Sequence, residues 1–247
     1  MMNSSYQRFA IVYDQLMQDI PYDQYVNWVK KHAPNEGFPK LLDIGCGTGT
    51  LSLLFHQEGY EVSGIDLSED MLAVAYERLQ AHGAAIPLFT MSMDELEGFT
   101  ELDVVTVPID SINYLSEEIQ VKETLKRIYD SLRLGGQLFF DVHSLFKMDY
   151  IFLESPFTYD DGEITYLWYT EPGEFEHSIY HQMTFFLKED SGRFERFDEE
   201  HFQRTFPIDI YVNWLRAIGF THVEVTADWT EASPSEESER IFIRAVK

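Results

Sequence analysis

The sequence of 247 residues contains a single cysteine, Cys46, which excludes an intramolecular disulfide and any metal site built from several cysteines. One thiol is typical of a reducing compartment, so we expect the cytoplasm. No run approaches the roughly 18 consecutive apolar residues that a membrane-spanning helix needs. The first ten residues, MMNSSYQRFA, lack the basic start and apolar core of a secretory signal. The sequence therefore predicts neither membrane insertion nor export.

Basic residues are also scarce. Lys and Arg number 18 against 43 Asp and Glu, which gives a formal net charge of −25. A surface this negative repels phosphate backbones and anionic lipid heads at long range. Nucleic acid is therefore disfavoured as a partner. His177 and His181 are four residues apart but lack the glutamate of a zinc-binding helix, and we expect no metal site.

Apolar residues make up 45% of the chain, which is ample for a sizeable core. From about residue 37, runs typical of strands alternate with runs typical of helices. This alternation predicts an α/β fold with a doubly wound, mostly parallel sheet. The expected strands cover 41–45, 60–66, 85–92, 103–109 and 137–144, and the expected helices cover 50–59, 68–83 and 117–133. Ser68 is the expected N-cap of the second helix, and Gly135-Gly136 the end of the third.

The segments on either side of this core have different patterns. Apolar and aromatic residues recur at helical spacing over 5–32, with Pro21 opening a second helix. Three aromatic, alternating runs predict an antiparallel insertion, at 163–171, 174–189 and 193–206. A helix over 208–219 and strands over 221–229 and 239–246 return to the core pattern. We therefore expect an N-terminal helical lid (1–36), a Rossmann-like core (37–147), a β insertion on the substrate side (148–206) and closing core elements (207–247).

The segment LLDIGCGTG, residues 41–49, places three glycines where a buried strand meets a helix. Such a loop lets a ligand approach the backbone and exposes helix N-terminal amides, as nucleotide cofactors require. A P-loop needs lysine and then Ser or Thr after its last glycine, but Thr50-Leu51-Ser52 follows Gly49. The dinucleotide fingerprint needs glycine at position 50 or 52 and also fails.

The pattern acid-x-Gly-x-Gly-x-Gly resembles that of the class I S-adenosylmethionine-dependent methyltransferases. Four stretches carry the resemblance in the right order, strongly from about residue 37 to 147: LLDIGCGTG, VSGIDLSEDML, DVVTVPIDSINYL and LRLGGQLFFDVHS. The resemblance implies a seven-stranded, Rossmann-like sheet, S-adenosylmethionine as the cofactor and methyl transfer as the activity.

The resemblance also implies roles for single residues. Asp43 would pair with the ammonium group of the cofactor, directly or through water. Gly45 and Gly47 would let the backbone pass beside the methionine and ribose. Asp66, at the end of the second strand, would accept from both ribose hydroxyls; the alternative is an ordinary acid at the start of a helix.

The adenine side departs from the family pattern. Ser92 stands where the family often has an acid, with Met93 and Asp94 after it. Either Ser92 or Asp94 would meet the adenine amino group, unless Asp94 only begins a short helix, and Met93 would cover the ring. The complete set of expected cofactor contacts is Asp43, Gly45, Cys46, Gly47, Gly49, Asp66, Leu67, Met71, Ser92, Met93, Asp94 and Ile109.

Methyl transfer from a sulfonium is an in-line displacement, and a general base is needed only when the acceptor carries a proton. The stretches DSINYL and YQRFAIVYD resemble those of small-molecule N-methyltransferases, including enzymes that act on amino sugars. The resemblance makes Tyr13 and Tyr114, and less securely Tyr6, flank the acceptor; a core position is the alternative for Tyr13. His143 would serve as a base or acceptor contact, or as an ordinary hydrogen-bonded residue.

The insertion adds His201 and Arg204 as polar candidates for the acceptor pocket, although its aromatics also fit simple packing against the main sheet. The resemblance to small-molecule N-methyltransferases thus implies transfer of a methyl group to a small-molecule acceptor, preferentially at nitrogen. The alternatives are a methyltransferase acting on protein or RNA and a non-catalytic S-adenosylmethionine-binding module. A monomer and a homodimer both stay open.

Overall fold

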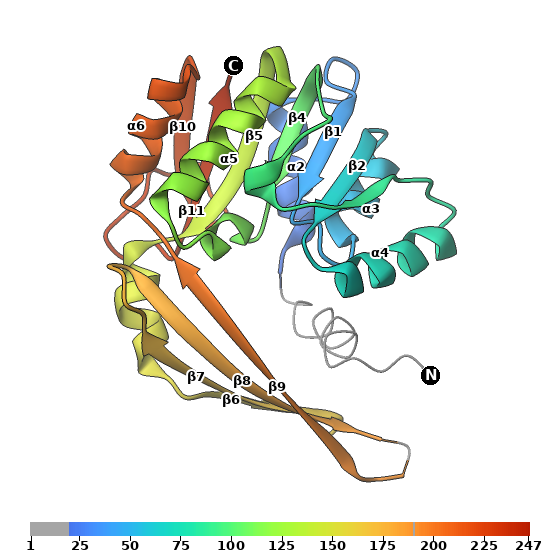
Figure 1. Ribbon diagram of the computed structural model, residues 1–247, viewed down its shortest axis with the longest axis vertical. Helices are drawn as coiled ribbons and strands as arrows, with labels where there is room; N and C mark the ends of the chain where they lie inside the picture. The colour runs from blue at the N-terminus through green and yellow to red at the C-terminus, as the bar shows by residue number, and fades with distance from the viewer. Residues whose placement is uncertain (1–19, 190) are drawn as a thin grey trace.

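The computed structural model describes residues 20–189 and 191–247. The helix expected over 5–20, with Tyr6 and Tyr13, lies outside these residues. A seven-stranded sheet with helices on both faces forms the core, and a four-stranded sheet extends from one of its edges (Figure 1). This architecture confirms the expected class I methyltransferase fold with an antiparallel insertion. None of the described helices is long and apolar enough to cross a membrane.

The large sheet has the strand order β10-β11-β5-β4-β1-β2-β3. Five neighbouring strands, β5, β4, β1, β2 and β3, run parallel to one another. Strand β11 is antiparallel to both β5 and β10. The carboxyl ends of the parallel strands therefore meet at one edge, the place where ligands bind in open α/β sheets. The strands are β1 Lys40–Ile44, β2 Glu61–Asp66, β3 Leu88–Thr90, β4 Leu102–Val107, β5 Leu132–His143, β10 His222–Ala227 and β11 Arg240–Val246.

Successive strand residues bury their side chains on opposite faces of this sheet. Leu41 packs under α2 and α3, whereas Leu42 packs with α5 and α6. Two apolar cores result, one on each face, and they hold the strand ends at the ligand edge. The helices are α2 Tyr22–His32, α3 Thr50–Gln57, α4 Glu69–Ala81, α5 Glu118–Ser131 and α6 Ile208–Ile218, with short turns η1 Met93–Glu95, η2 Ser111–Tyr114, η3 Lys147–Ile151 and η4 Phe152–Glu154.

Two helix starts confirm the capping predictions. Pro21 directly precedes α2, and the Ser68 side chain caps α4 by accepting from the Met71 amide at 3.2 Å. The predicted end of the third helix was wrong, because α5 stops at Ser131 and Gly135-Gly136 lie inside β5. A Cβ on Gly136 would lie 2.9 Å from the carbonyl oxygen of Leu102, so this glycine allows β5 to approach β4 closely.

The insertion contains four strands rather than the three expected, in the order β6-β7-β8-β9. The additional strand is short and largely exposed, so its residues show little of the alternation on which sequence patterns depend. The chain leaves the core after His143 and returns at Thr205, whose hydroxyl donates to the His143 carbonyl at 2.6 Å. The insertion therefore starts and ends at the same point of the core. Its strands are β6 Phe157–Asp160, β7 Ile164–Pro172, β8 Ser178–Lys188 and β9 Phe194–Arg204.

Candidate functional site

The glycine loop between β1 and α3 is tied to β2 by backbone hydrogen bonds. The amides of Gly45 and Cys46 donate to the Ile65 carbonyl at 2.8 and 3.0 Å. The Gly47 amide donates to the Asp66 carboxylate at 2.8 Å, and the Ser68 amide donates to the same carboxylate at 2.8 Å. Asp66 therefore fixes the shape of the loop as well as facing the ligand edge.

Gly45 and Gly47 have different structural reasons for lacking a side chain. Both have positive φ, +69° and +53°. A Cβ on Gly45 would lie 2.7 Å from the Ser111 hydroxyl, so this glycine lets the loop close against the segment after β4. A Cβ on Gly47 would meet nothing within 4 Å, so Gly47 borders open space. Gly49, at the start of α3, packs against Ala75 of α4.

Asp43 is an acid with no exposed surface at the end of β1. It accepts from the hydroxyls of Ser52 at 2.6 Å and Thr106 at 3.0 Å, and no described cation pairs with it. Burial raises the pKa of Asp43 to about 6, although both hydrogen bonds act in the opposite direction. This carboxyl is thus poised to accept a positive charge brought by a ligand.

A cavity of about 40 Å³ joins Asp43 to Gly47, Ile109 and Tyr22. A buried water needs about 10 to 15 Å³, so this cavity suits ordered water between Asp43 and a ligand. Tyr22 is the first residue of α2 and was not among the expected site residues. The described part of the N-terminal segment therefore borders the same cavity as the glycine loop.

The turn after β4 has a strained backbone. Ile109 and Asp110 both have left-handed φ, +52° and +51°, which is unfavourable for a β-branched residue such as isoleucine. Their amides donate to the two carboxylate oxygens of Asp141 on β5, at 2.7 and 3.0 Å. Asp141 therefore holds this turn beside the glycine loop.

A buried ionic network supports the same turn. Arg240, at the start of β11, pairs with Asp141 and with Asp110, the latter at 2.8 Å. Gln203 of the insertion donates to Asp110 at 2.8 Å. Burial alone would raise the pKa of Asp110, but His143 and Arg240 hold it well below its ordinary value. This network was not predicted from the sequence, in which the one local signal is Asp141, a lone acid within an apolar strand.

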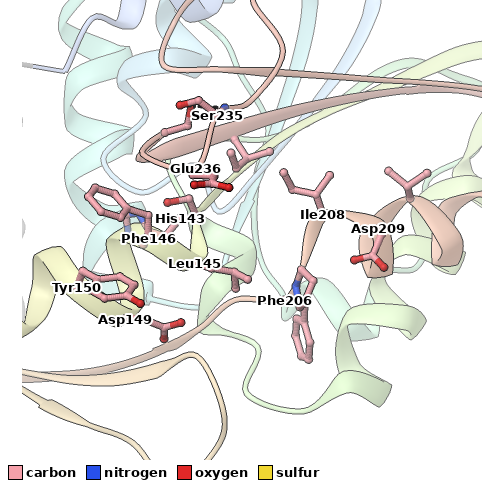
Figure 2. Close-up of a pocket in the computed structure, with 15 residues that line it drawn as sticks. His143, Leu145, Phe146, Asp149, Tyr150, Phe206, Ile208, Asp209, Ser235 and Glu236 are labelled. Carbon is pink, nitrogen blue, oxygen red and sulfur yellow. Dashed lines mark hydrogen bonds between the residues drawn. The ribbon is translucent and has the colours of Figure 1, made fainter.

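His143 ends β5 and faces Asp110, with 3.3 Å between its Nε2 and the carboxylate. Burial lowers the pKa of His143, although Asp110 acts in the opposite direction. Because Nε2 meets a carboxylate, it carries the proton, and Nδ1 has no hydrogen-bond partner. His143 borders a different cavity, of about 780 Å³, between η3 and the start of α6 (Figure 2). His143, expected to contact the acceptor, thus contacts Asp110 and the larger cavity, and it does not line the small cavity beside the glycine loop.

The insertion is joined to the turn after β4 at η2. Asn113 donates to the Arg204 carbonyl at 2.7 Å and accepts from the His143 amide at 2.9 Å. The half-exposed ring of Tyr114 lies edge-on to His201, with 5.8 Å between centroids. The structure therefore brings Tyr114 and His201 together, whereas Arg204 meets the turn through its carbonyl and donates from its guanidinium to the Ser116 carbonyl at 2.9 Å.

On the adenine side, Ser92 donates to Asp94, which also accepts from Gln120 at 3.2 Å. The two candidates for the adenine contact are thus hydrogen-bonded to each other. Asp94 lies in the short helix η1, which agrees with the alternative that it only begins a short helix. Met93 is partly buried against the main core. Leu67 is exposed, and Met71 packs against an apolar cluster of the insertion.

No described group of His, Cys, Asp or Glu is arranged to hold a metal ion. His177, expected in a strand, lies in the loop before β8 and bonds Asp149 at 2.7 Å. The site is instead a crevice at the carboxyl edge of the sheet, with two buried or half-buried acids that lack a cationic partner, Asp43 and Asp66. Such a crevice suits a ligand that carries positive charge and hydroxyl groups.

Comparison with known proteins agrees with this geometry. Residues 41–136 match the family described as "Methyltransferase domain". The chain is 47% identical over 246 residues to a Geobacillus sp. (strain WCH70) protein named "Putative methyltransferase GWCH70_2453", covering 98% of this chain and 100% of that one.

Two solved structures share the fold. An S-adenosylmethionine-dependent methyltransferase from Clostridium acetobutylicum ATCC 824 has a TM-score of 0.88 at 24% identity and covers 98% of this chain and 99% of its own. CalS10 with bound S-adenosylmethionine, an amino pentose methyltransferase from Micromonospora echinaspora, has a TM-score of 0.72 at 17% identity and covers 99% of both chains. With the family match, the full-length relative and the shared strand order, the chain belongs to the class I S-adenosylmethionine-dependent methyltransferases, and S-adenosylmethionine is its cofactor.

Proposed function

We propose that this methyltransferase acts on a nitrogen atom of a small-molecule acceptor, held between the turn after β4 and the insertion. The observation that carries the proposal is the attachment of β9 to η2, where Asn113 bonds Arg204 and Tyr114 packs on His201. This attachment places an antiparallel sheet beside the reacting edge. The amino pentose methyltransferase of similar fold supports a small amine as acceptor. The net charge of −25 supports it against RNA.

The residues of the crevice fit the cofactor. S-adenosylmethionine supplies an electrophilic methyl group on a sulfonium and carries an ammonium group. Asp43 would bind the ammonium group through ordered water in the small cavity, and open space at Gly47 leaves room for the ligand. The Asp66 carboxylate uses two of its roughly four lone-pair sites for backbone amides and keeps the others for ribose hydroxyls. We propose that the remaining contacts come from Gly45, Cys46, Gly49, Leu67, Met71, Ser92, Met93, Asp94 and Ile109.

The acceptor residues divide into two roles in this proposal. Tyr114, half-exposed at the crevice, would contact the acceptor, as would Tyr13 of the N-terminal segment. His143 would act through Asp110, because its Nε2 proton is directed to that carboxylate and helps to fix the turn beside the sulfonium. Catalysis would then depend on alignment and exclusion of water more than on a dedicated base.

We also propose the division of labour expected from the sequence. Residues 37–147 and 207–247 would bind the cofactor and build the core, 148–206 would contact the acceptor, and 1–36 would form a lid. Tyr22, the first residue of α2, lines the small cavity and supports a role for this segment at the cofactor site, while the buried face of α2 packs into the main core.

The direct test supplies the purified protein with S-adenosylmethionine labelled in its methyl group, together with a library of small amines and matched alcohols. Release of S-adenosylhomocysteine and a labelled amine, located by mass spectrometry, is the expected result. Label found only in added protein or RNA would favour the macromolecular alternative. Cofactor binding without transfer to any acceptor would favour a non-catalytic binding module.

A further inference from the structure

Glu199 on β9 is a buried carboxylate that nothing in the described chain neutralises. Its side chain is 6% exposed, and its Oε1 has no hydrogen-bond partner. No described Lys, Arg or His forms an ion pair with it. Burial raises the pKa of Glu199. An unpaired buried acid is costly to the fold, so its retention points to a ligand that completes it.

The position of Glu199 follows from the two-residue period of β9. Gln203, His201 and Glu199 share one face, because side chains alternate along a strand. Gln203 donates to Asp110 and His201 packs on Tyr114, so this face is directed toward the turn after β4. Glu199 follows at the next step, about 7 Å further along the strand.

The cross-strand neighbour of Glu199 connects this part of the insertion to α4. Its direct partner on β8 is Met183, which packs against an apolar cluster together with Met71 of α4. Met71 lies five residues after Asp66, in the helix that follows the ribose-side acid. Glu199 therefore lies along the path between the turn after β4 and the start of α4.

The histidines on this face do not supply positive charge. Trp168 donates to His181 Nδ1 at 3.1 Å, which requires that nitrogen to be unprotonated. Burial, together with His143 and His201, lowers the pKa of His181 to about 3. Burial also lowers the pKa of His201. At neutral pH neither His181 nor His201 therefore carries a charge that could pair with Glu199.

Two basic residues of the insertion, Arg204 and Arg196, have partners other than Glu199. Arg204 bonds the Ser116 carbonyl and stacks on the Phe206 ring at 4.5 Å. Arg196 pairs with exposed Asp198 at 2.8 Å. The segment 148–206 contains 14 acidic and 4 basic residues, so it attracts cations and repels phosphate-bearing ligands. Among its described acids, Glu199 alone is buried.

We propose that Glu199 anchors the acceptor by pairing with an ammonium group, so that this enzyme selects amine-bearing, phosphate-free small molecules. The inference rests on the proposed small-molecule function and names the chemical class of its acceptor. Glu199 determines specificity here; the atom that receives the methyl group is a separate question. A neutral analogue that lacks the ammonium would leave the carboxylate buried and unpaired, and it would be rejected for that reason.

The test compares Glu199→Gln with Glu200→Gln, a matched control at the next position of the same strand on the exposed opposite face. Titration calorimetry on protein saturated with S-adenosylhomocysteine would use benzylamine, cyclohexylamine and spermidine, each beside its hydroxyl analogue. We expect the amines to bind wild type and Glu200→Gln alike, and Glu199→Gln at least tenfold more weakly. Absence of amine binding to wild type, or equal binding by Glu199→Gln, overturns the proposal.

A second readout needs no ligand. Glutamine removes the unpaired charge, so Glu199→Gln should melt at a higher temperature than wild type at pH 7.5. The difference should shrink as the pH falls and the wild-type carboxyl takes up a proton. The other titratable groups on this face, His181, His201, Tyr166 and Glu195, are present in both proteins, so their own titration cancels in the difference. A lower melting temperature for Glu199→Gln would show a structural partner and refute the anchor.

The two proposals fail in different ways. If the enzyme methylates no small molecule, the transfer assay on wild type shows it, whatever Glu199 does. If Glu199 is not the anchor, wild-type transfer persists while Glu199→Gln keeps its affinity for amines. S-adenosylhomocysteine affinity should be unchanged in both variants, which separates acceptor binding from cofactor binding.

Discussion

Replacing Asp43 by asparagine should stabilise the free protein while weakening its hold on the cofactor. Asp43 is fully buried, its pKa is about 6, and its two partners are the neutral hydroxyls of Ser52 and Thr106. Both hydroxyls can rotate to donate or accept, so an asparagine of nearly the same shape fits the same site. The substitution therefore removes the charge and little else.

The magnitude follows from the pKa. A free aspartate titrates near 3.9, so the folded value is about 2 units higher, which corresponds to about 3 kcal/mol. Because the folded pKa is raised, this contribution is fully present below the unfolded pKa and is lost as pH rises through about 6. The melting temperature of Asp43→Asn relative to wild type should thus increase by roughly 6 to 12 °C between pH 4 and pH 7.5, at about 2 to 4 °C per kcal/mol.

The assay combines thermal melting across this pH range with calorimetric titration of S-adenosylmethionine at pH 7.5. Loss of a charge-assisted contact, worth about 1.5 to 3 kcal/mol, should weaken binding at least tenfold. Asp103→Asn is the control: Asp103 is also buried, but Arg133 and the Lys40 amide pair with it, so its loss should destabilise the protein. A melting difference for Asp43→Asn that does not change with pH, or unchanged cofactor affinity, would refute the reasoning.

Three further predictions concern other parts of the molecule. Asp66→Ala should weaken S-adenosylmethionine binding at least tenfold and lower the melting temperature by a few degrees, because two backbone amides lose their acceptor. Calorimetry measures the affinity and thermal melting of the free protein measures the stability. Unchanged affinity would show that Asp66 only supports the loop. Arg240→Met should cost about 3 to 5 kcal/mol in urea denaturation, because it leaves Asp110 and Asp141 buried without a cation, and a loss below about 1 kcal/mol would contradict the network. Fluorescence anisotropy should detect no tight binding of tRNA at physiological salt, and strong, salt-sensitive binding would revive the RNA alternative.

Features that depend on neighbouring residues were predictable from the sequence. The glycine loop, the Ser68 cap and the order of strands and helices in the core all follow from short-range patterns and were confirmed. Gly135-Gly136 misled because glycine pairs end helices and also permit close strand contacts, and only the approach to the Leu102 carbonyl separates the two.

Features that depend on distant residues were not predictable. Arg240 meets Asp110 and Asp141 across separations of 130 and 99 residues, and nothing near it in the sequence indicates those partners. The unpaired state of Glu199 is also a property of the fold, since its neighbours Asp198 and Glu200 are acids with the same local chemistry but an exposed face. Periodicity assigns such residues to a face, and only the packed structure shows what opposes them.

The hydrogen bond between Thr205 and the His143 carbonyl has an evolutionary consequence. Because the insertion departs and returns at one point, its length and composition can change without moving any strand of the cofactor-binding sheet. Natural selection can therefore exchange the insertion, which we propose contacts the acceptor, while the strands of the main sheet stay constant. The same junction is a rational crossover point for chimeras, in which residues 148–206 of one enzyme would replace those of another to transfer substrate preference.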